Sequence, residues 1–287
     1  MLPALLFYAS LVNDVRSLVA RHDLEGAARI VESYRAQAGP TSELAAAESW
    51  LARAAFDAHN YQQADRYATE TRTLSDGLLR THKLDADPWL PTAVGASIEV
   101  HAQALAAQGE RSQAVAYLQQ QANLFSGTSI HDRIQKNLNL LSLVGKPAPP
   151  LAEGLTFGDG RHPVLLFFWA HWCPDCKAEV PILAEIERTY VPRGLVLIGP
   201  TRLYGYVAGG EDAPPAVEKQ YIERVRQQYY SSLVMPTPMS TANFQAYGAS
   251  TTPTLVLIDS RGIVRLYHPG AMSGADLARQ IEAVLSR

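Results

Sequence analysis

The segment FFWAHWCPDCKAEVP, residues 167–181, decides the fold of the C-terminal half of this 287-residue chain. An apolar run, VLLFF at 164–168, leads into it without polar alternation, which is typical of a central strand covered on both faces. The chain has two cysteines, Cys173 and Cys176, and both lie where this strand gives way to a predicted helix. Two thiols placed at random would rarely fall so close together at such a junction, so the spacing indicates chemistry.

A helix start suits a reactive thiolate at Cys173. The first backbone N–H groups of a helix have no intrahelical partner, and the helix dipole favours negative charge there. Pro174 fits the first helical position, because its missing N–H would otherwise be unpaired. Cys176 then faces Cys173 across one turn, close enough to close a disulfide. We expect Cys173 to be the exposed attacking sulfur and Cys176 the shielded resolving one.

Two other roles for the pair are a structural disulfide and a zinc site. A disulfide across so short a separation closes too small a loop to stabilise the fold much. A zinc site needs four ligands, and beyond the two thiols only His171 is local. The sequence therefore favours a redox-active disulfide between Cys173 and Cys176. We expect no metal site and no dissociable cofactor.

Proline marks the domain boundary. The stretch VGKPAPPLAEG, residues 144–154, holds three prolines, and a helix cannot continue through it. After it, strand-like runs alternate with helical patterns, which predicts an α/β domain over residues 144–287. The expected strands are 163–170, 194–199, 254–260 and 262–268, and the expected helices are 174–190, 216–230 and 274–286.

The N-terminal part, residues 1–143, has a helical pattern from about residue 11 onward, with apolar residues three and four apart and abundant alanine. Three segments, HDLEGAARIVESY, HNYQQADRYATET and GERSQAVAYLQQQ, each join a polar turn to a helix opened by a small residue, Ala27, Ala64 or Ala114. Their spacings of 37 and 50 residues are irregular beside about 34 for a tetratricopeptide unit. A degenerate tetratricopeptide-like stack of helical hairpins and a generic helical bundle both fit. Either would offer a packing or partner-binding surface.

Composition and charge exclude several classes of partner. With 47% apolar and 18% charged residues, the chain reads as an ordinary globular protein whose length suits two domains. The formal net charge is −3 and neither half concentrates Lys and Arg, so we expect no nucleic acid and no anionic membrane surface as partner. No apolar stretch reaches the roughly 18 residues of a membrane span. The apolar residues 1–10 resemble the tail of a signal peptide, but no Lys or Arg precedes them, which favours the first turn of a helix.

The C-terminal half resembles the thioredoxin superfamily, and within it the TlpA/ResA-like thiol:disulfide oxidoreductases. The resemblance rests on VGKPAPPL at 144–151, on the WCxxC run quoted above, and on TTPTLVLIDSRGIV at 251–264. It implies a thioredoxin-like fold and an enzyme that exchanges thiols and disulfides. The helical N-terminal half lies outside the resemblance.

The resemblance also implies roles for residues outside the cysteine pair. The family places a cis-proline opposite its CxxC, and Pro253 matches that position, so that Thr252 would offer its backbone to an extended substrate. The alternative is an ordinary trans proline that opens an edge strand. The family also carries a glutamate beneath the pair. Glu179, one helical turn after Cys176, corresponds to it and would serve as general base for the resolving thiol, whereas without the family it would be a solvated surface residue.

Two departures from ordinary thioredoxin bear on the redox direction. Phe167 stands where thioredoxin keeps a buried acid, which leaves Glu179 as the candidate proton carrier. Asp175, inside the motif, should raise the pKa of the Cys173 thiol by like-charge repulsion. A less stabilised thiolate favours a reductant over an oxidant.

The surroundings of the pair complete the expected site. Trp169 is expected to pack beneath the motif. His171 would either help to stabilise the thiolate or, as we favour, lie exposed. Loop 202–215, with Tyr204 and Tyr206, is expected near the active-site end. The residues expected to face the substrate, beside Thr252 and Pro253, are Trp172, Pro174 and Asp175.

The leading prediction is a protein-disulfide reductant. Cys173 would attack a substrate disulfide, Cys176 would resolve the mixed disulfide, and an upstream thiol reductase would restore the pair, while the helical half recruits a protein partner. The alternative is a redox-sensing or scaffold protein whose helical repeats bind a partner and whose thioredoxin domain has little turnover. A peroxidase of the peroxiredoxin type fits less well, because that family uses a single peroxidatic cysteine in a threonine-containing loop. By family analogy we expect a location outside the bacterial cytoplasm, in the periplasm or cell envelope, although a cytoplasmic protein with two cysteines would look the same.

Overall fold

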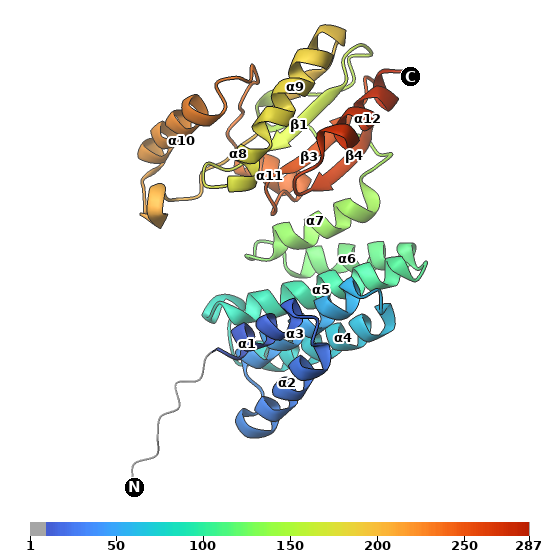
Figure 1. Cartoon of the computed structure of the whole chain (residues 1–287), viewed down its shortest axis with the longest axis vertical. Coiled ribbons are helices and arrows are strands. Elements are labelled where there is room, and N and C mark those ends of the chain that lie inside the picture. The colour runs from blue at the N-terminus through green and yellow to red at the C-terminus, as the bar shows by residue number, and fades with distance from the viewer. Residues whose placement is uncertain (1–9, 287) are drawn as a thin grey trace. The chain divides into compact units, whose positions relative to one another are not determined.

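The structure is a computed structural model of the chain, and it describes residues 10–286 (Figure 1). The prediction for residues 1–10 concerns positions that, apart from Ser10, lie outside the described residues. The chain separates into two compact units, one ending at Asn137 and the other starting at Leu138. The first unit is helical, and the second holds the described strands.

Helical hairpins build the N-terminal unit. Neighbouring helices from α1 to α6 contact one another along the chain, and α1, α3 and α5 also pack in succession, so that each hairpin covers the apolar side of the next. Among the described residues, the helices up to the start of the second unit are α1 (Leu11–Ala20), α2 (Leu24–Ala38), α3 (Ser42–Asp57), α4 (Tyr61–Leu79), α5 (Trp89–Ala107), α6 (Arg111–Leu124) and α7 (His131–Ser142).

The three repeated sequence segments share one turn geometry. Their turn residues have positive φ values of 61°, 58° and 92°, at His22, His59 and Gly109 respectively. In each turn, the next residue donates its backbone N–H to the carbonyl five residues earlier. The small residues that open the following helices, Ala27, Ala64 and Ala114, are fully buried. The predicted helical hairpins are therefore confirmed, and their assignment to the tetratricopeptide class stays a prediction.

A partly buried ion cluster joins α5 to the start of α7. Glu99 Oε2 accepts a hydrogen bond from Arg133 Nε at 2.6 Å, and Oε1 accepts one from Lys136 Nζ at 3.0 Å. Burial raises the pKa of Glu99, but the two cations outweigh it and bring the pKa to about 2. The carboxylate therefore stays charged and holds two helices together at any ordinary pH.

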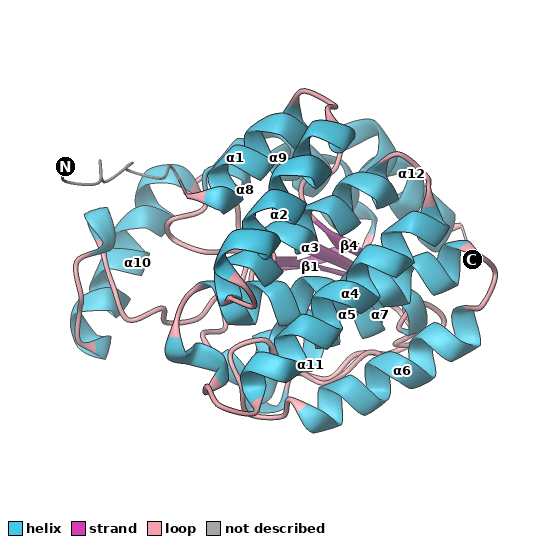
Figure 2. Ribbon diagram, turned by 90° about the horizontal axis from the view of Figure 1, so that it is seen from below, coloured by secondary structure: helices cyan, strands magenta, loops and turns pink. Residues whose placement is uncertain are grey.

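A mixed four-stranded sheet organises the second unit, with the strand order β2-β1-β3-β4. β1 runs parallel to β2 and antiparallel to β3, and β3 runs antiparallel to β4. Figure 2 shows the strands gathered in this sheet while the rest of the described chain is helix and loop. The sheet confirms the predicted α/β class. Its strands are β1 (Val164–Phe168), β2 (Val196–Ile198), β3 (Thr254–Ile258) and β4 (Val264–Pro269).

Both faces of the sheet are covered, which explains its unbroken apolar runs. Leu165 and Phe167 of β1 pack against α9, α10 and α12 on one face, and Figure 1 shows α9 and α12 side by side there. Leu166 and Phe168 pack against α11 on the other face. The helices of this unit are α8 (Pro174–Ala178), α9 (Val180–Tyr190), α10 (Pro215–Tyr229), α11 (Thr241–Tyr247) and α12 (Gly274–Leu285).

Pro181 interrupts the helix that the sequence predicts over 174–190. Two helices, α8 and α9, meet there at Glu179. A proline has no N–H to donate to the carbonyl four residues earlier, here that of Lys177, and its ring crowds the preceding turn. The interruption leaves Glu179 between the two helices, beside the cysteine motif.

Helix α11 has no counterpart among the predicted elements. It has only seven residues, too few for a helical period to stand out in the sequence. Its apolar side nevertheless supports the active-site strand, because the rings of Phe244 and Tyr247 each lie 5.2 Å from the ring of Phe168.

The end of α7 packs with the second unit. The sequence places the domain boundary before Val144, whereas the compact units divide after Asn137, inside α7. Leu143 belongs to the core on the α11 side of the sheet, and the Asn139 side chain is hydrogen-bonded to Tyr267 of β4. These two contacts draw the end of the helix to the sheet.

Candidate active site

The two cysteines meet where β1 leads into α8. Cys173 is the N-cap of α8, and Pro174 occupies its first turn. A disulfide joins Cys173 to Cys176, with the two Cα atoms 5.3 Å apart. The backbone N–H of Cys176 points at Sγ of Cys173, 3.0 Å away. An N–H held at this sulfur is placed to stabilise a thiolate once the pair is reduced.

The expected exposure of Cys173 is wrong for the disulfide-bonded state. Cys173 is 1% exposed and Cys176 is fully buried, so the two sulfurs scarcely differ in access to solvent. The reason is that Sγ of Cys173 faces the protein, 3.4 Å from the carbonyl oxygen of Thr252. In this state the neighbouring residues cover the sulfur, so a substrate must first contact those residues.

Thr252 and Pro253 lie opposite the disulfide. The peptide bond between them is cis, as the family resemblance implies. Pro253 precedes β3, which is paired with β1 on one side and β4 on the other, so the alternative of a trans proline at an edge strand does not hold. This arrangement directs the Thr252 carbonyl at Sγ of Cys173.

Glu179 is a buried acid and not a solvated surface residue, with only 2% of its surface exposed. Its Oε1 accepts the backbone N–H of Met272 at 3.2 Å. Burial raises the pKa of Glu179 and Asp175 raises it further, while the Met272 hydrogen bond and His268 oppose them. The net shift is upward, which brings this carboxyl group closer to the range in which it can exchange protons at neutral pH.

The tryptophans on either side of His171 have opposite environments. Trp169 is fully buried, and its Nε1 donates a hydrogen bond to the Gly199 carbonyl at 3.0 Å. Trp172 is 45% exposed beside Cys173. Pro174 and Asp175 are exposed as well. The three side chains predicted to face a substrate are thus all accessible around the motif.

His171 is buried, contrary to the favoured expectation of an exposed residue. It is 1% exposed, and its Nε2 lies 3.2 Å from Oε1 of Glu218, which is equally buried. Burial lowers the pKa of His171 more than the nearby carboxylate raises it. The imidazole is therefore neutral at pH 7 and donates its Nε2–H to Glu218. The hydrogen bond to Glu218 offsets the free-energy cost of burying the polar imidazole of His171.

Glu218 and the loop it holds are functional candidates that the sequence analysis left unassigned. A signal was present, because Glu218 shares one face of α10 with Ile222 and Val225, both buried, at a position where an apolar residue is expected. Tyr204 and Tyr206 do lie near the active-site end, as predicted. The ring of Tyr204 is 5.5 Å from that of Trp172, and the ring of Tyr206 is 5.4 Å from that of His171.

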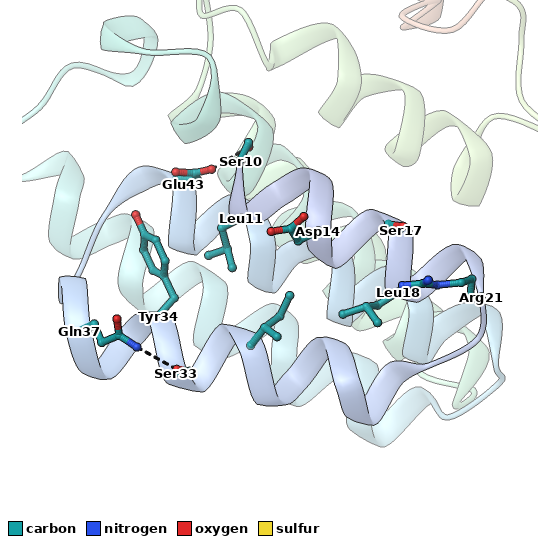
Figure 3. Close-up of a pocket in the computed structure, with 11 residues that line it drawn as sticks. Ser10, Leu11, Asp14, Ser17, Leu18, Arg21, Ser33, Tyr34, Gln37 and Glu43 are labelled. Atoms are coloured by element: carbon teal, nitrogen blue, oxygen red, sulfur yellow. Dashed lines mark hydrogen bonds between the residues drawn. The ribbon is translucent and has the colours of Figure 1, made fainter. Parts of the chain in front are cut away.

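A groove of about 590 Å³ lies between α1 and α2 in the helical unit (Figure 3). Leu11, Leu18 and Tyr34 point into it from the two helices. Its rim is polar, with Ser10 donating to Glu43 at 2.7 Å.

Neither a metal centre nor a membrane span is found in the described part of the chain. Between residues 10 and 286, no group of three or more His, Cys, Asp or Glu side chains is arranged to hold a metal ion. Over the same residues, no helix combines the length and apolar character that crossing a bilayer requires.

The C-terminal half has relatives among known proteins. Residues 156–285 match the family model of a thioredoxin-like domain. The chain is 30% identical over 143 residues to the thiol:disulfide interchange protein DsbE of Yersinia pestis, across 46% of this chain and 67% of that protein. It is 27% identical over 154 residues to DsbE of Xylella fastidiosa, across 50% and 71% of the two chains. It is 26% identical over 121 residues to the thiol-disulfide oxidoreductase ResA of Geobacillus thermodenitrificans, across 42% and 62%.

Proposed function

The chain belongs to the thioredoxin-like thiol:disulfide oxidoreductases, and we propose that within this family it is a reductant of disulfides in other proteins. The observation that carries the proposal is the placement of Cys173. It caps α8, its sulfur receives the backbone N–H of Cys176, and the Thr252 carbonyl stands 3.4 Å away on the opposite side. A nucleophilic sulfur, its resolving partner and a backbone docking group thus meet at one point.

The proposed reaction passes two electrons from the pair to the substrate. The Cys173 thiolate attacks one sulfur of the substrate disulfide, and the other substrate sulfur leaves as a thiolate that takes up a proton. The Cys176 thiolate then attacks Sγ of Cys173, which releases the second substrate thiolate and closes the Cys173–Cys176 disulfide. An upstream thiol reductase returns the two electrons. The pair is itself the redox group, so the reaction uses no dissociable cofactor.

Two acids would tune these steps. Asp175 is exposed in the first turn of α8, where its charge disfavours the Cys173 thiolate and so favours donation of electrons. Glu179 is buried one turn after Cys176, and its raised pKa suits a general base that takes the proton of the resolving thiol. We assign no metal to the reaction.

The substrate would dock beside Thr252 and Pro253. An extended segment on either side of its disulfide would pair with the Thr252 backbone, while Trp172, Pro174 and Asp175 supply the surrounding contact surface. The helical unit would bind a further protein partner, and the groove between α1 and α2 is the candidate place for a segment of that partner. By family analogy, the protein would work outside the cytoplasm.

Reduction of insulin disulfides by the full chain, with dithiothreitol as electron source, tests the activity. We expect turnover, and a reduction potential near the thioredoxin value of about −270 mV. Cys176→Ser should accumulate a mixed disulfide with insulin because the resolving thiol is missing, whereas Cys173→Ser should form none. A potential near about −120 mV would overturn the reductant assignment. A reversible disulfide without turnover would favour the redox-sensing alternative.

The role of Asp175 has its own test. Asp175→Asn removes a negative charge next to Cys173, so the thiolate becomes easier to form. We expect the reduction potential to become more oxidising by roughly 10 to 30 mV, where 30 mV is a tenfold change in the equilibrium constant. Asp276→Asn, an exposed acid in the first turn of α12, is the matched control and should leave the potential unchanged.

A further inference from the structure

A buried acid–histidine pair lies beside the disulfide and has no part in the thiol exchange proposed above. His171 stands two residues before Cys173, and Glu218 comes from the first turn of α10; each is 1% exposed. Burying ionisable groups costs free energy unless polar partners compensate them. The hydrogen bonds that Glu218 accepts provide these polar partners.

Glu218 ties the turn between β1 and α8 to the loop that follows β2. Besides the bond to His171, its Oε1 accepts the backbone N–H of Tyr204 at 2.6 Å, and its Oε2 accepts that of Gly205 at 2.8 Å. Hydrogen bonds to an ionised acceptor are stronger and shorter than neutral ones. Both oxygens of one carboxylate are thus spent on fixing residues 204 and 205 against the segment that carries Cys173.

The loop held in this way presents an aromatic wall. The ring of His171 is packed edge-on among Tyr204, Tyr206 and Tyr221, with ring centroids 5.3 to 5.6 Å away. Tyr204 in turn meets Trp172 at 5.5 Å in an edge-to-face arrangement. Trp172 is exposed and adjacent to Cys173, whose own sulfur is covered. Trp172 and the ring of Tyr204 behind it are therefore part of the surface beside that sulfur.

The loop has further internal support. Tyr206 forms an isolated antiparallel bridge with Asp212, and the backbone N–H of Ala213 donates to the Gly205 carbonyl at 2.9 Å. The Arg202 guanidinium lies over the Tyr204 ring at 5.0 Å, a cation–π contact that helps to hold that ring. Glu218 fastens this closed loop to the cysteine-bearing segment, together with the ring contacts of Tyr204 and Tyr206.

We propose that His171 and Glu218 are positioning residues that hold Tyr204 against Trp172, and that the resulting wall selects protein disulfides flanked by apolar or aromatic side chains. The proposal rests on the proposed function, because it concerns the substrate of the same site. The wall consists of aromatic rings, whose favourable partners are apolar and aromatic groups. The buried pair does not touch the reacting sulfurs, so its loss should weaken docking and leave the exchange chemistry in place.

Two cyclic peptides, each with one internal disulfide, provide the test. In one, Leu and Phe flank the cysteines, and in the other, Ser and Gly do. The unmodified protein should reduce the apolar peptide with a kcat/KM about fivefold higher than the polar one, since contacts of this kind contribute about 1 kcal/mol. Glu218→Gln puts an amide group where the backbone N–H groups need an acceptor, and should reduce this preference to about twofold or less.

Matched variants make the result specific. Tyr204→Leu leaves the buried pair intact and removes the aromatic wall, so it should lose the preference as Glu218→Gln does. Glu223→Gln, on the exposed side of the same helix and paired with Arg226, should keep the preference. In Glu218→Gln the loss should lie in KM for the apolar peptide. The kcat for that peptide and the rate with bis(2-hydroxyethyl) disulfide should stay within about twofold of the values for the unmodified protein. The reduction potential should stay within about 10 mV.

Two results would overturn the inference, and a third would overturn the proposed function. An equal preference in the unmodified protein and both variants would show that the wall does not select substrates. A fall in the rate with bis(2-hydroxyethyl) disulfide, together with a shifted potential in Glu218→Gln, would show that the pair acts on the cysteines. Failure of the unmodified protein to reduce either peptide would refute the proposed function itself, which separates that failure from a failure of the inference alone.

Discussion

At the scale of a single residue, Glu179 shows how burial prepares a group for proton transfer. The carboxyl group is 2% exposed, and burial is the largest cause of its raised pKa. It therefore keeps its proton to a higher pH than an ordinary glutamate and becomes a carboxylate only above that point. A base that serves Cys176 gains from this, because proton transfer is most effective when the pKa of the base lies near the working pH.

The first prediction concerns the resolving step in Glu179→Gln. In the unmodified protein, the mixed disulfide formed with insulin should decay faster as pH rises through the raised pKa of Glu179, because the carboxylate form accepts the Cys176 proton. The variant should resolve it at least about 10-fold more slowly and lack this rise, given that positioned acid–base groups contribute about 10²- to 10⁴-fold. Rapid-quench sampling of the mixed disulfide from pH 5 to 9 measures both effects. Identical pH profiles of decay in the unmodified protein and in Glu179→Gln would show that Glu179 takes no part in the mechanism. The control is Glu185→Gln, which replaces an exposed acid paired with Arg188.

The same residue has a predictable effect on stability. Its folded-state pKa lies above the unfolded value, so the folded state binds the proton more tightly. The free energy of unfolding that this contributes is complete below the unfolded pKa and is lost as pH rises through the folded one. Glu179→Gln should not show that loss, which amounts to about 1.4 kcal/mol for each tenfold difference in proton affinity. Urea unfolding of both proteins at several pH values from 4 to 8 checks the sign.

At the scale of secondary-structure elements, α5 and α7 depend on the charge of Glu99. Its carboxylate binds Arg133 and Lys136, and the pKa falls from 4.5 to about 2. The stability linked to this shift is present above the unfolded pKa and is lost as pH falls through the folded value. Since the Glu99 side chain is only 18% exposed, solvent screens the interaction weakly.

The second prediction is therefore that Glu99→Gln destabilises the helical unit at pH 7 and not at pH 2. The expected loss at pH 7 is about 2 to 3 kcal/mol, because two cations keep their partly buried positions without a counter-charge. Urea unfolding followed by circular dichroism at 222 nm measures it. Glu25→Gln removes a pair between side chains that are 71% and 92% exposed, and should cost less than about 0.5 kcal/mol. A pH-independent difference for Glu99→Gln would contradict the electrostatic origin.

Elements with a strong local signal could be predicted from the sequence, and those that depend on a distant partner could not. The apolar run of β1 and the short spacing between Cys173 and Cys176 are local features of the sequence. The strand and the disulfide that they predict are both present in the structure. Helix α11 has too few residues to show a period, and Pro181 divides a helix whose apolar pattern continues across it. The burial of His171 depends on Glu218, 47 residues away, and no pattern around either residue reveals that pairing.

At the scale of the whole molecule, the apolar cores of the two units are made by separate parts of the chain. The helical unit builds its core around α1, α2 and α3, whereas the cores on the two faces of the sheet use residues from Leu143 onward. The disulfide and every described contact of its two cysteines lie within the second unit. We therefore expect closing or opening of this disulfide to change contacts within that unit.

The third prediction is that hydrogen exchange separates the reductase from the redox sensor. Comparing the oxidised and reduced full chain by mass spectrometry, we expect changes in protection only within residues 138–287, concentrated around the cysteine motif and Thr252. Changes in α1 to α6 would instead show that the redox state reaches the helical hairpins, as the sensing alternative requires. The double variant Cys173→Ser/Cys176→Ser, exposed to the same reductant, should show no change and so controls for the reductant itself.

The loop fastened by Glu218 also has a meaning for how such an enzyme diversifies. The cysteine pair and the Thr252–Pro253 bond belong to the segments around β1, α8 and β3, while the loop between β2 and α10 is joined to the segment before Cys173 by the Glu218 carboxylate and by ring contacts with His171 and Trp172. We expect changes in the length or side chains of that loop to leave the sulfur chemistry unaltered as long as Glu218 and His171 are kept. On the proposal above, substrate choice and redox function are separable properties of one domain.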